Sequence, residues 1–205
     1  MAYSDFTLTD VKEKLLLSLN EKERLFPMTE PLECSPHLKE TLKFNIPLAV
    51  SIDTEKARSE LIVTPVLVEL IKQSNSELSL FSGIEFNVDK TKGLNGTCDY
   101  MLSLSKEQLF LDVPIIAIVE AKNDRINSGM GQYIAEMFAS KLCNDSKQKS
   151  IPNIYGVVTT GSLWRFLKLH DDTVWIDIDE YPISNVSKIM GIFISIVTAK
   201  TADKY

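Results

Sequence analysis

The chain has 205 residues, a net charge of −6, and 44% hydrophobic and 24% charged residues, a composition typical of a globular protein that can bury a core without disulfides. Its three isolated cysteines form no Cys-x-x-Cys pair, and no stretch reaches the ~18 apolar residues of a membrane span. We therefore expect a cytoplasmic protein with no zinc site, no disulfide framework and no membrane partner, and the acidic balance disfavours a dedicated nucleic-acid-binding domain.

Residues 1–50 are expected to form a helical and loop-rich extension that packs on a larger domain, residues 51–205. A short amphipathic helix is predicted for residues 11–17, after the capping residues Thr9 and Asp10. Prolines between residues 27 and 36 predict a broken passage, with one helical turn over residues 37–44.

The first long helix is predicted for residues 51–73. Asp53 or Thr54 can cap it, and apolar residues recur at nearly helical spacing. Pro65 interrupts the pattern and should kink the helix. Glu60 lies beside the apolar stripe, and by itself it resembles an ordinary surface glutamate.

Three strands are predicted next, over residues 78–88, 97–103 and 115–122. The turn before the second strand contains two glycines and an asparagine, and the connections are short enough for an antiparallel meander. Asp99 lies in the second strand, and we expect its side chain on the face opposite Cys98 and Tyr100.

The third strand is apolar from Val113 to Val119 apart from Pro114, and it ends in two charges of opposite sign. Such a run predicts a strand buried on both faces. Glu120 and Lys122 should point to the same side of the sheet, about 6.5–7 Å apart along the strand. A desolvated charge is costly unless it is paired or binds a metal. The end of this strand therefore predicts a functional site with partners for Glu120 and Lys122.

The remaining chain is expected to alternate helices and strands. A helix capped by Ser128 should run to about Asn144, with Gln132 in its first turns, where backbone N–H groups attract anions. A strand over residues 154–160, a hairpin of strands 163–169 and 174–178, and a final helix over residues 185–201 should follow.

The polar residues of these elements form a pattern that suits phosphodiester hydrolysis. Mg²⁺ prefers oxygen ligands, often one or two carboxylates with water and phosphate oxygen. Asp99 and Glu120 could share one ion, with the backbone carbonyl of Ala121 as a further ligand. Lys122 could then orient the attacking water and stabilise the developing charge on phosphorus.

A two-part motif consists of Gly96-Thr97-Cys98-Asp99-Tyr100 and Val119-Glu120-Ala121-Lys122, with twenty residues between Asp99 and Glu120. Through this motif the chain resembles the PD-(D/E)xK phosphodiesterase superfamily, which includes restriction endonuclease-like and RecB-like nucleases. The resemblance spans Asp53 to Leu169. It implies an α/β fold with a mixed sheet: a restriction endonuclease-like core of helix, three-strand meander, helix and strand, here with an added C-terminal hairpin and helix.

The resemblance also implies roles for individual residues. It makes Asp99 and Glu120 metal ligands, Lys122 the residue that assists water, and Gln132 a ligand of water or phosphate, while Glu60 completes the metal sphere. Two positions depart from the family pattern: Cys98 replaces a proline, and Glu136 stands where RecB-like proteins pair the glutamine with a tyrosine.

We therefore expect a Mg²⁺-dependent nuclease that also accepts Mn²⁺. Its partner should be nucleic acid, with DNA as the expected substrate, which it would cleave as an endonuclease or an exonuclease. One alternative is a catalytically silent nuclease-like binding or assembly module, which the acidic charge supports. Another is an RNA-directed or junction-resolving nuclease with the same catalytic residues. A homodimer is compatible with this function, because a nuclease with one site must act twice to cut both strands.

Overall fold

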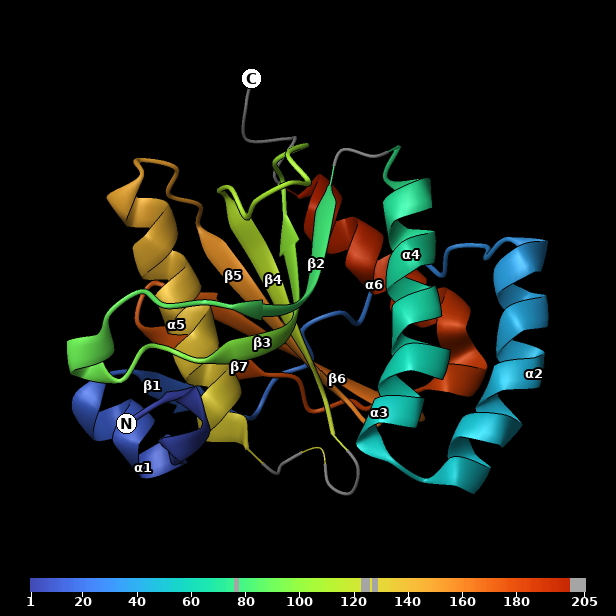
Figure 1. Ribbon diagram of the computed structural model, residues 1–205, viewed down its shortest axis with the longest axis horizontal. Coiled ribbons are helices and arrows are strands. Elements are labelled where there is room, and N and C mark those ends of the chain that lie inside the picture. The colour runs from blue at the N-terminus through green and yellow to red at the C-terminus, as the bar shows by residue number, and fades with distance from the viewer. Residues whose placement is uncertain (76–77, 123–125, 127–128, 200–205) are drawn as a thin grey trace.

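The computed structural model describes residues 1–75, 78–122, 126 and 129–199. Within these residues, eight strands form one mixed sheet that is flanked by helices (Figure 1). The strands are β1 (Ser18–Asn20), β2 (Ser79–Glu85), β3 (Thr97–Ser103), β4 (Ile115–Ala121), β5 (Asn153–Thr159), β6 (Leu163–His170), β7 (Thr173–Ile176) and β8 (Tyr181–Pro182). The expected α/β class with a mixed sheet is confirmed.

The helical elements are of three kinds: α-helices, short 3₁₀ turns and one π-helical turn. They are η1 (Tyr3–Asp5), α1 (Leu8–Lys14), α2 (Pro36–Ile52), α3 (Glu55–Arg58), the π-helical turn η2 (Ser59–Val63), α4 (Thr64–Gln73), η3 (Lys90–Lys92), α5 (Met130–Ser146), η4 (Ile183–Asn185) and α6 (Val186–Thr198). Ser128, the expected cap of α5, and the predicted end of the last helix at residues 200 and 201 lie outside the described residues.

The sheet has the strand order β1-β7-β6-β5-β4-β3-β2, with β8 paired to β6. Strands β2, β3 and β4 form the predicted antiparallel meander, and β6 and β7 form the predicted hairpin. Strand β4 is central and lies parallel to β5, which explains why its sequence is continuously apolar. The sequence patterns did not predict β1 or β8, which have three and two residues and so show little periodicity.

Helices cover both faces of the sheet. Helix α5 packs on β4 and β5 on one side, together with η1 and α1, while α2, α4 and α6 lie on the other side (Figure 1). Both faces of β4 therefore contribute to hydrophobic cores, and every residue from Ile115 to Ala121 is buried.

The N-terminal helices differ from the sequence prediction. In place of one turn over residues 37–44, helix α2 runs for 17 residues. It begins where Ser35 accepts a hydrogen bond from the Leu38 N–H and Pro36 occupies the first turn, where its missing N–H costs nothing. The predicted boundary at residue 50 falls within α2, and the proposed division into two parts stays a prediction.

The predicted helix over residues 51–73 is divided into three elements. Asp53 has a left-handed backbone (φ 52°) and ends α2, and Thr54 caps α3 by accepting from the Ala57 N–H. A π-helical turn then precedes α4, at the place where Pro65 was expected to disturb the helix. Pro65 cannot donate to the preceding turn, and the carbonyl of Leu61 accepts instead from Asn45 Nδ2 at 2.8 Å.

No helix in the described part of the chain combines the length and the apolar character needed to cross a membrane.

Candidate active site

The candidate site lies where β3 and β4 separate. The last backbone pair of the two strands is Tyr100 with Val119, so Asp99 and Glu120 occupy the next opposed positions. There the Asp99 N–H donates to Glu120 Oε1 at 3.2 Å, and the Ala121 N–H donates to Asp99 Oδ2 at 2.9 Å. Each carboxylate thus replaces a backbone carbonyl of the opposite strand, while β4 continues beside β5.

Glu120 and Lys122 lie on the same side of β4, as their spacing predicted. Glu120 is only 1% exposed, and Lys122 Nζ lies 3.5 Å from Glu120 Oε2 with 20% of its side chain exposed. The ammonium also lies 5.4 Å from the ring centroid of Tyr133 on α5, a cation–π distance. Tyr133 and Glu120 together direct the lysine toward the end of β4.

Glu136 on α5 is a third carboxylate that sequence reasoning did not assign to the site. It is fully buried, and its Oε1 accepts a hydrogen bond from Gln132 Nε2 at 3.0 Å, one helical turn earlier. Its Oε2 has no hydrogen-bond partner among the residues that the structure describes, and the negative charge of Glu136 acts on the buried carboxylate of Glu120. The predicted Gln132 therefore joins the site through Glu136.

The three carboxylates strongly affect one another. Burial, followed by the negative charges of Glu136 and Asp99, raises the pKa of Glu120 well above its usual range, although Lys122 opposes this effect. Burial is also the main cause that raises the pKa of Glu136 to about 7, against hydrogen bonds that favour its ionised form. Glu120 and Glu136 thus share one ammonium group in an environment of low polarity, which disfavours the charged form of both glutamates.

A cavity of about 270 Å³ opens beside Asp99, and we name it the Asp99 cavity. Two further predicted metal ligands, Glu60 and Ala121, also line it. The Glu60 side chain is 62% exposed, and its Oε1 lies 3.6 Å from Lys56 Nζ. Glu60 therefore reaches the same cavity as Asp99 but is paired with a lysine of its own helix turn.

The structure thus brings the predicted residues together in two neighbouring sets. Asp99, Glu120 and Lys122 meet at the separation of the strands, while Glu60 and Ala121 share the Asp99 cavity. Within the described ranges, no three Asp, Glu, His or Cys side chains are placed to hold one metal ion together. The ligand role of each residue stays a prediction.

The chemistry of this donor set nevertheless fits a divalent cation. Two carboxylates with one backbone carbonyl are ligands of the kind that Mg²⁺ uses, with substrate and water oxygen completing its sphere. When Asp99, Glu120 and Glu136 are ionised, their three charges exceed the single ammonium of Lys122, and a cation would balance the excess. The Oε2 of Glu136 also has no partner in the described structure. Glu136 could have been suspected from its spacing, because it lies one turn after Gln132 between apolar residues.

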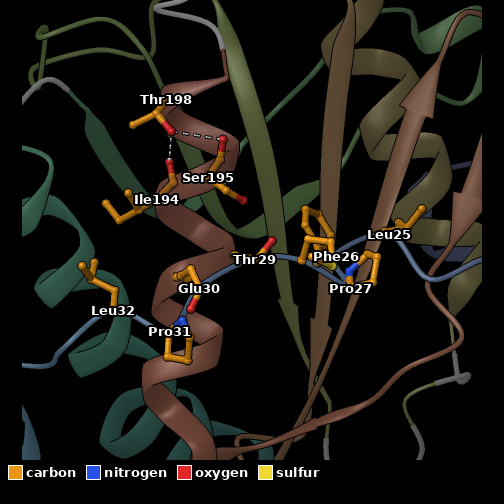
Figure 2. Close-up of a pocket in the computed structure, with 12 residues that line it drawn as sticks. Leu25, Phe26, Pro27, Thr29, Glu30, Pro31, Leu32, Ile194, Ser195 and Thr198 are labelled. Atoms are coloured by element: carbon orange, nitrogen blue, oxygen red, sulfur yellow. Dashed lines mark hydrogen bonds between the residues drawn. The ribbon is translucent and has the colours of Figure 1, made fainter.

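A larger cavity of about 540 Å³ lies elsewhere, between residues 25–32 and α6 (Figure 2). The hydroxyl groups on its helical side bond to their own helix: Thr198 Oγ1 donates to the Ile194 carbonyl at 2.8 Å, and Ser195 Oγ donates to the Ile192 carbonyl at 2.7 Å. Lys188 Nζ donates to two carbonyls of the crossing segment. Lys188 thus holds the segment in place, and these groups form no convergent set of catalytic side chains.

Comparison with known proteins adds no family assignment. No protein-family model and no curated protein matches the chain.

Proposed function

We propose that this protein is a Mg²⁺-dependent phosphodiesterase that cleaves nucleic acid, with DNA as the substrate. The observation that carries the proposal is the meeting of Asp99 and Glu120 where β3 and β4 separate, with Lys122 Nζ 3.5 Å from the glutamate. A buried carboxylate paired with a partly exposed ammonium, next to an aspartate that lines a cavity, provides groups that metal-assisted hydrolysis uses. The resemblance to the PD-(D/E)xK superfamily supports the same function.

Each residue has a definite role in this proposal. Asp99, Glu120 and the Ala121 carbonyl would hold Mg²⁺, and the bound ion would supply Lewis-acid polarisation of the phosphate and a water of lowered pKa. Lys122 hydrogen-bonds the attacking water and stabilises the developing negative charge. Gln132 holds Glu136 next to Glu120, so it sets the charge around Glu120 in addition to any contact with phosphate.

The described lysines do not form a free basic surface at the site, so the protein would bind its nucleic-acid substrate weakly or act as part of a larger assembly. Lys141 and Lys147, from the basic cluster at the end of α5, have carboxylate or carbonyl partners on neighbouring loops. Lys141 and Lys147 lie roughly 17 and 26 Å along the helix axis from Met130, since a helix rises about 1.5 Å per residue. Near the site, Lys56 and Lys122 are the described lysines that face Glu60 and Glu120.

A nuclease-like binding or assembly module is the second candidate. The net charge of −6 favours it, because phosphate neutralisation supplies most of the affinity for nucleic acid. In that case the carboxylates of Asp99 and Glu120 would only cap the N–H groups left where the strands separate.

The Lys122→Met variant separates these two functions. We expect its rate of Mn²⁺-dependent DNA cleavage to fall at least about a hundredfold, because the group that stabilises transition-state charge is lost. Its Mn²⁺ affinity should be equal to that of the wild type or higher, because a positive charge 3.5 Å from Glu120 has been removed. Single-turnover cleavage assays and calorimetric titration measure the two effects.

Lys141→Met is the matched control, since it removes a lysine at the distant end of α5. Wild-type cleavage should be tested on double-stranded DNA, single-stranded DNA, RNA and branched DNA, which distinguishes the proposed substrate from the RNA and junction alternatives. The absence of metal-dependent cleavage on every substrate would favour the binding module. Equal cleavage rates for Lys122→Met and the wild type would remove Lys122 from the mechanism.

A further inference from the structure

Three hydroxyl groups meet in the wall of the Asp99 cavity. Tyr100 Oη lies 2.5 Å from Ser59 Oγ and 2.8 Å from Thr64 Oγ1, and all three residues line the cavity together with Asp99. Tyr100 is buried, whereas Ser59 and Thr64 are half-buried. The cluster is therefore anchored in the core and reaches the cavity through its serine and threonine.

The hydroxyl groups offer more protons than their carbonyl acceptor can take. The Ser59 carbonyl accepts the Thr64 N–H that closes the π-helical turn, and Thr64 Oγ1 and Tyr100 Oη also lie within 3.1 and 3.2 Å of it. A carbonyl oxygen has two lone pairs, so one of the two hydroxyls must donate elsewhere. Tyr100 can donate to Ser59 Oγ, and the Ser59 proton can then be donated to a ligand.

The turn itself does not need these side chains. Backbone donation from Thr64 closes η2, and Asn45 satisfies the carbonyl that Pro65 leaves without a donor. π-Helical turns occur frequently at functional sites, and this one places Ser59 and Glu60 in the same cavity. The hydroxyl cluster therefore calls for an explanation beyond helix geometry.

We propose that Ser59 is a substrate-binding residue, whose hydroxyl donates to a non-bridging oxygen of the phosphodiester next to Asp99, and that Tyr100 and Thr64 are positioning residues. This inference rests on the proposed function, because it assigns the phosphodiester to the same cavity. A phosphate oxygen carries negative charge and strengthens the hydrogen bond that it accepts. Donation from Tyr100 to Ser59 Oγ polarises the serine further in the same direction.

The test is binding of a fluorescently labelled DNA oligonucleotide in Ca²⁺, measured by fluorescence anisotropy. Ser59→Ala should raise the Kd about tenfold, the loss expected for one hydrogen bond to a charged group. Tyr100→Phe, which removes the donation to Ser59 Oγ but keeps the serine hydroxyl, should raise the Kd by less. The double variant should lose no more than Ser59→Ala alone, because without the serine hydroxyl Tyr100 has no group to position. Ser82→Ala, which removes a hydroxyl from the β2 side of the cavity, should stay within about twofold of the wild type.

Thermal unfolding and Mn²⁺ titration of the same variants separate binding from folding, and Thr64→Val replaces Tyr100→Phe if the latter is unstable. Unchanged oligonucleotide affinity in Ser59→Ala, equal losses in Ser59→Ala and Ser82→Ala, or no binding by the wild type would overturn the inference. Oligonucleotide binding that depends on Ser59, without Mn²⁺ binding or cleavage, would sustain the inference and contradict the proposed function.

Discussion

The Glu120→Gln variant is expected to cleave DNA in Mn²⁺ at least about a thousandfold more slowly than the wild type, the equivalent of roughly 4 kcal/mol in activation free energy. The substitution removes the negative charge of Glu120. That charge would hold the cation, and in the wild type it also pairs with Lys122 Nζ, 3.5 Å away. The fold should persist, because the amide oxygen can still accept from the Asp99 N–H. Single-turnover cleavage and circular dichroism measure the two outcomes.

Glu85→Gln is a suitable control for this variant, because Glu85 is an exposed glutamate on the neighbouring β2. It should cleave DNA within about twofold of the wild type, as expected for a surface change away from the site. If Glu120→Gln retained the wild-type rate while it remained folded, Glu120 would be only a cap for the separated strands.

The Glu136→Gln variant is expected to be more stable than the wild type at pH 8 and equally stable at pH 4.5 or below. Burial raises the pKa of Glu136 from 4.5 to about 7, so the folded state binds a proton more tightly than the unfolded state. The resulting stabilisation is fully present below pH 4.5 and is lost as the pH rises through about 7. At pH 8 the wild type should therefore be less stable than the variant by up to about 3 kcal/mol.

Denaturant titration in EDTA at the two pH values measures this difference, and Glu60→Gln is its control, since Glu60 is largely exposed. Effects of pH that are common to all variants cancel in the comparison with wild type. A stability difference between Glu136→Gln and wild type that does not change with pH would show that the buried pair does not favour the protonated form. In this variant burial still raises the pKa of Glu120, whereas the contribution from the charge of Glu136 is lost.

The central part of the fold was predictable because its signals are local. The apolar run of β4 and the charges that end it mark a buried strand with an abrupt polar end, and β3 to β4 has the expected antiparallel register. The sequence pattern therefore placed Asp99 and Glu120 on neighbouring strands, and the register that opposes them is seen in the structure. The sequence spacing also placed Lys122 on the side of Glu120.

Other parts depend on contacts between distant segments, which a pattern along one chain does not report. The spacing of Glu136 from Gln132 can draw attention to it, but only the packing of α5 on β4 brings it close to Glu120. The hydroxyl cluster joins residues 41 positions apart, Ser59 and Tyr100, through a π-helical turn that helical periodicity cannot predict. The length of α2 does not follow from its prolines, which usually break helices, because Pro36 begins this helix and Pro47 lies within it.

Calorimetric titration of the wild type and Asp99→Asn with Mn²⁺ at neutral pH tests the central claim most directly. The asparagine can still accept from the Ala121 N–H, so the variant keeps the strand contact and loses only the charge. We predict saturable Mn²⁺ binding by the wild type and an affinity at least about tenfold lower in Asp99→Asn, as expected for the loss of a charged ligand. The absence of saturable binding by the wild type, or equal affinities in both proteins, would contradict the assignment of a metal-dependent nuclease site to the end of β4.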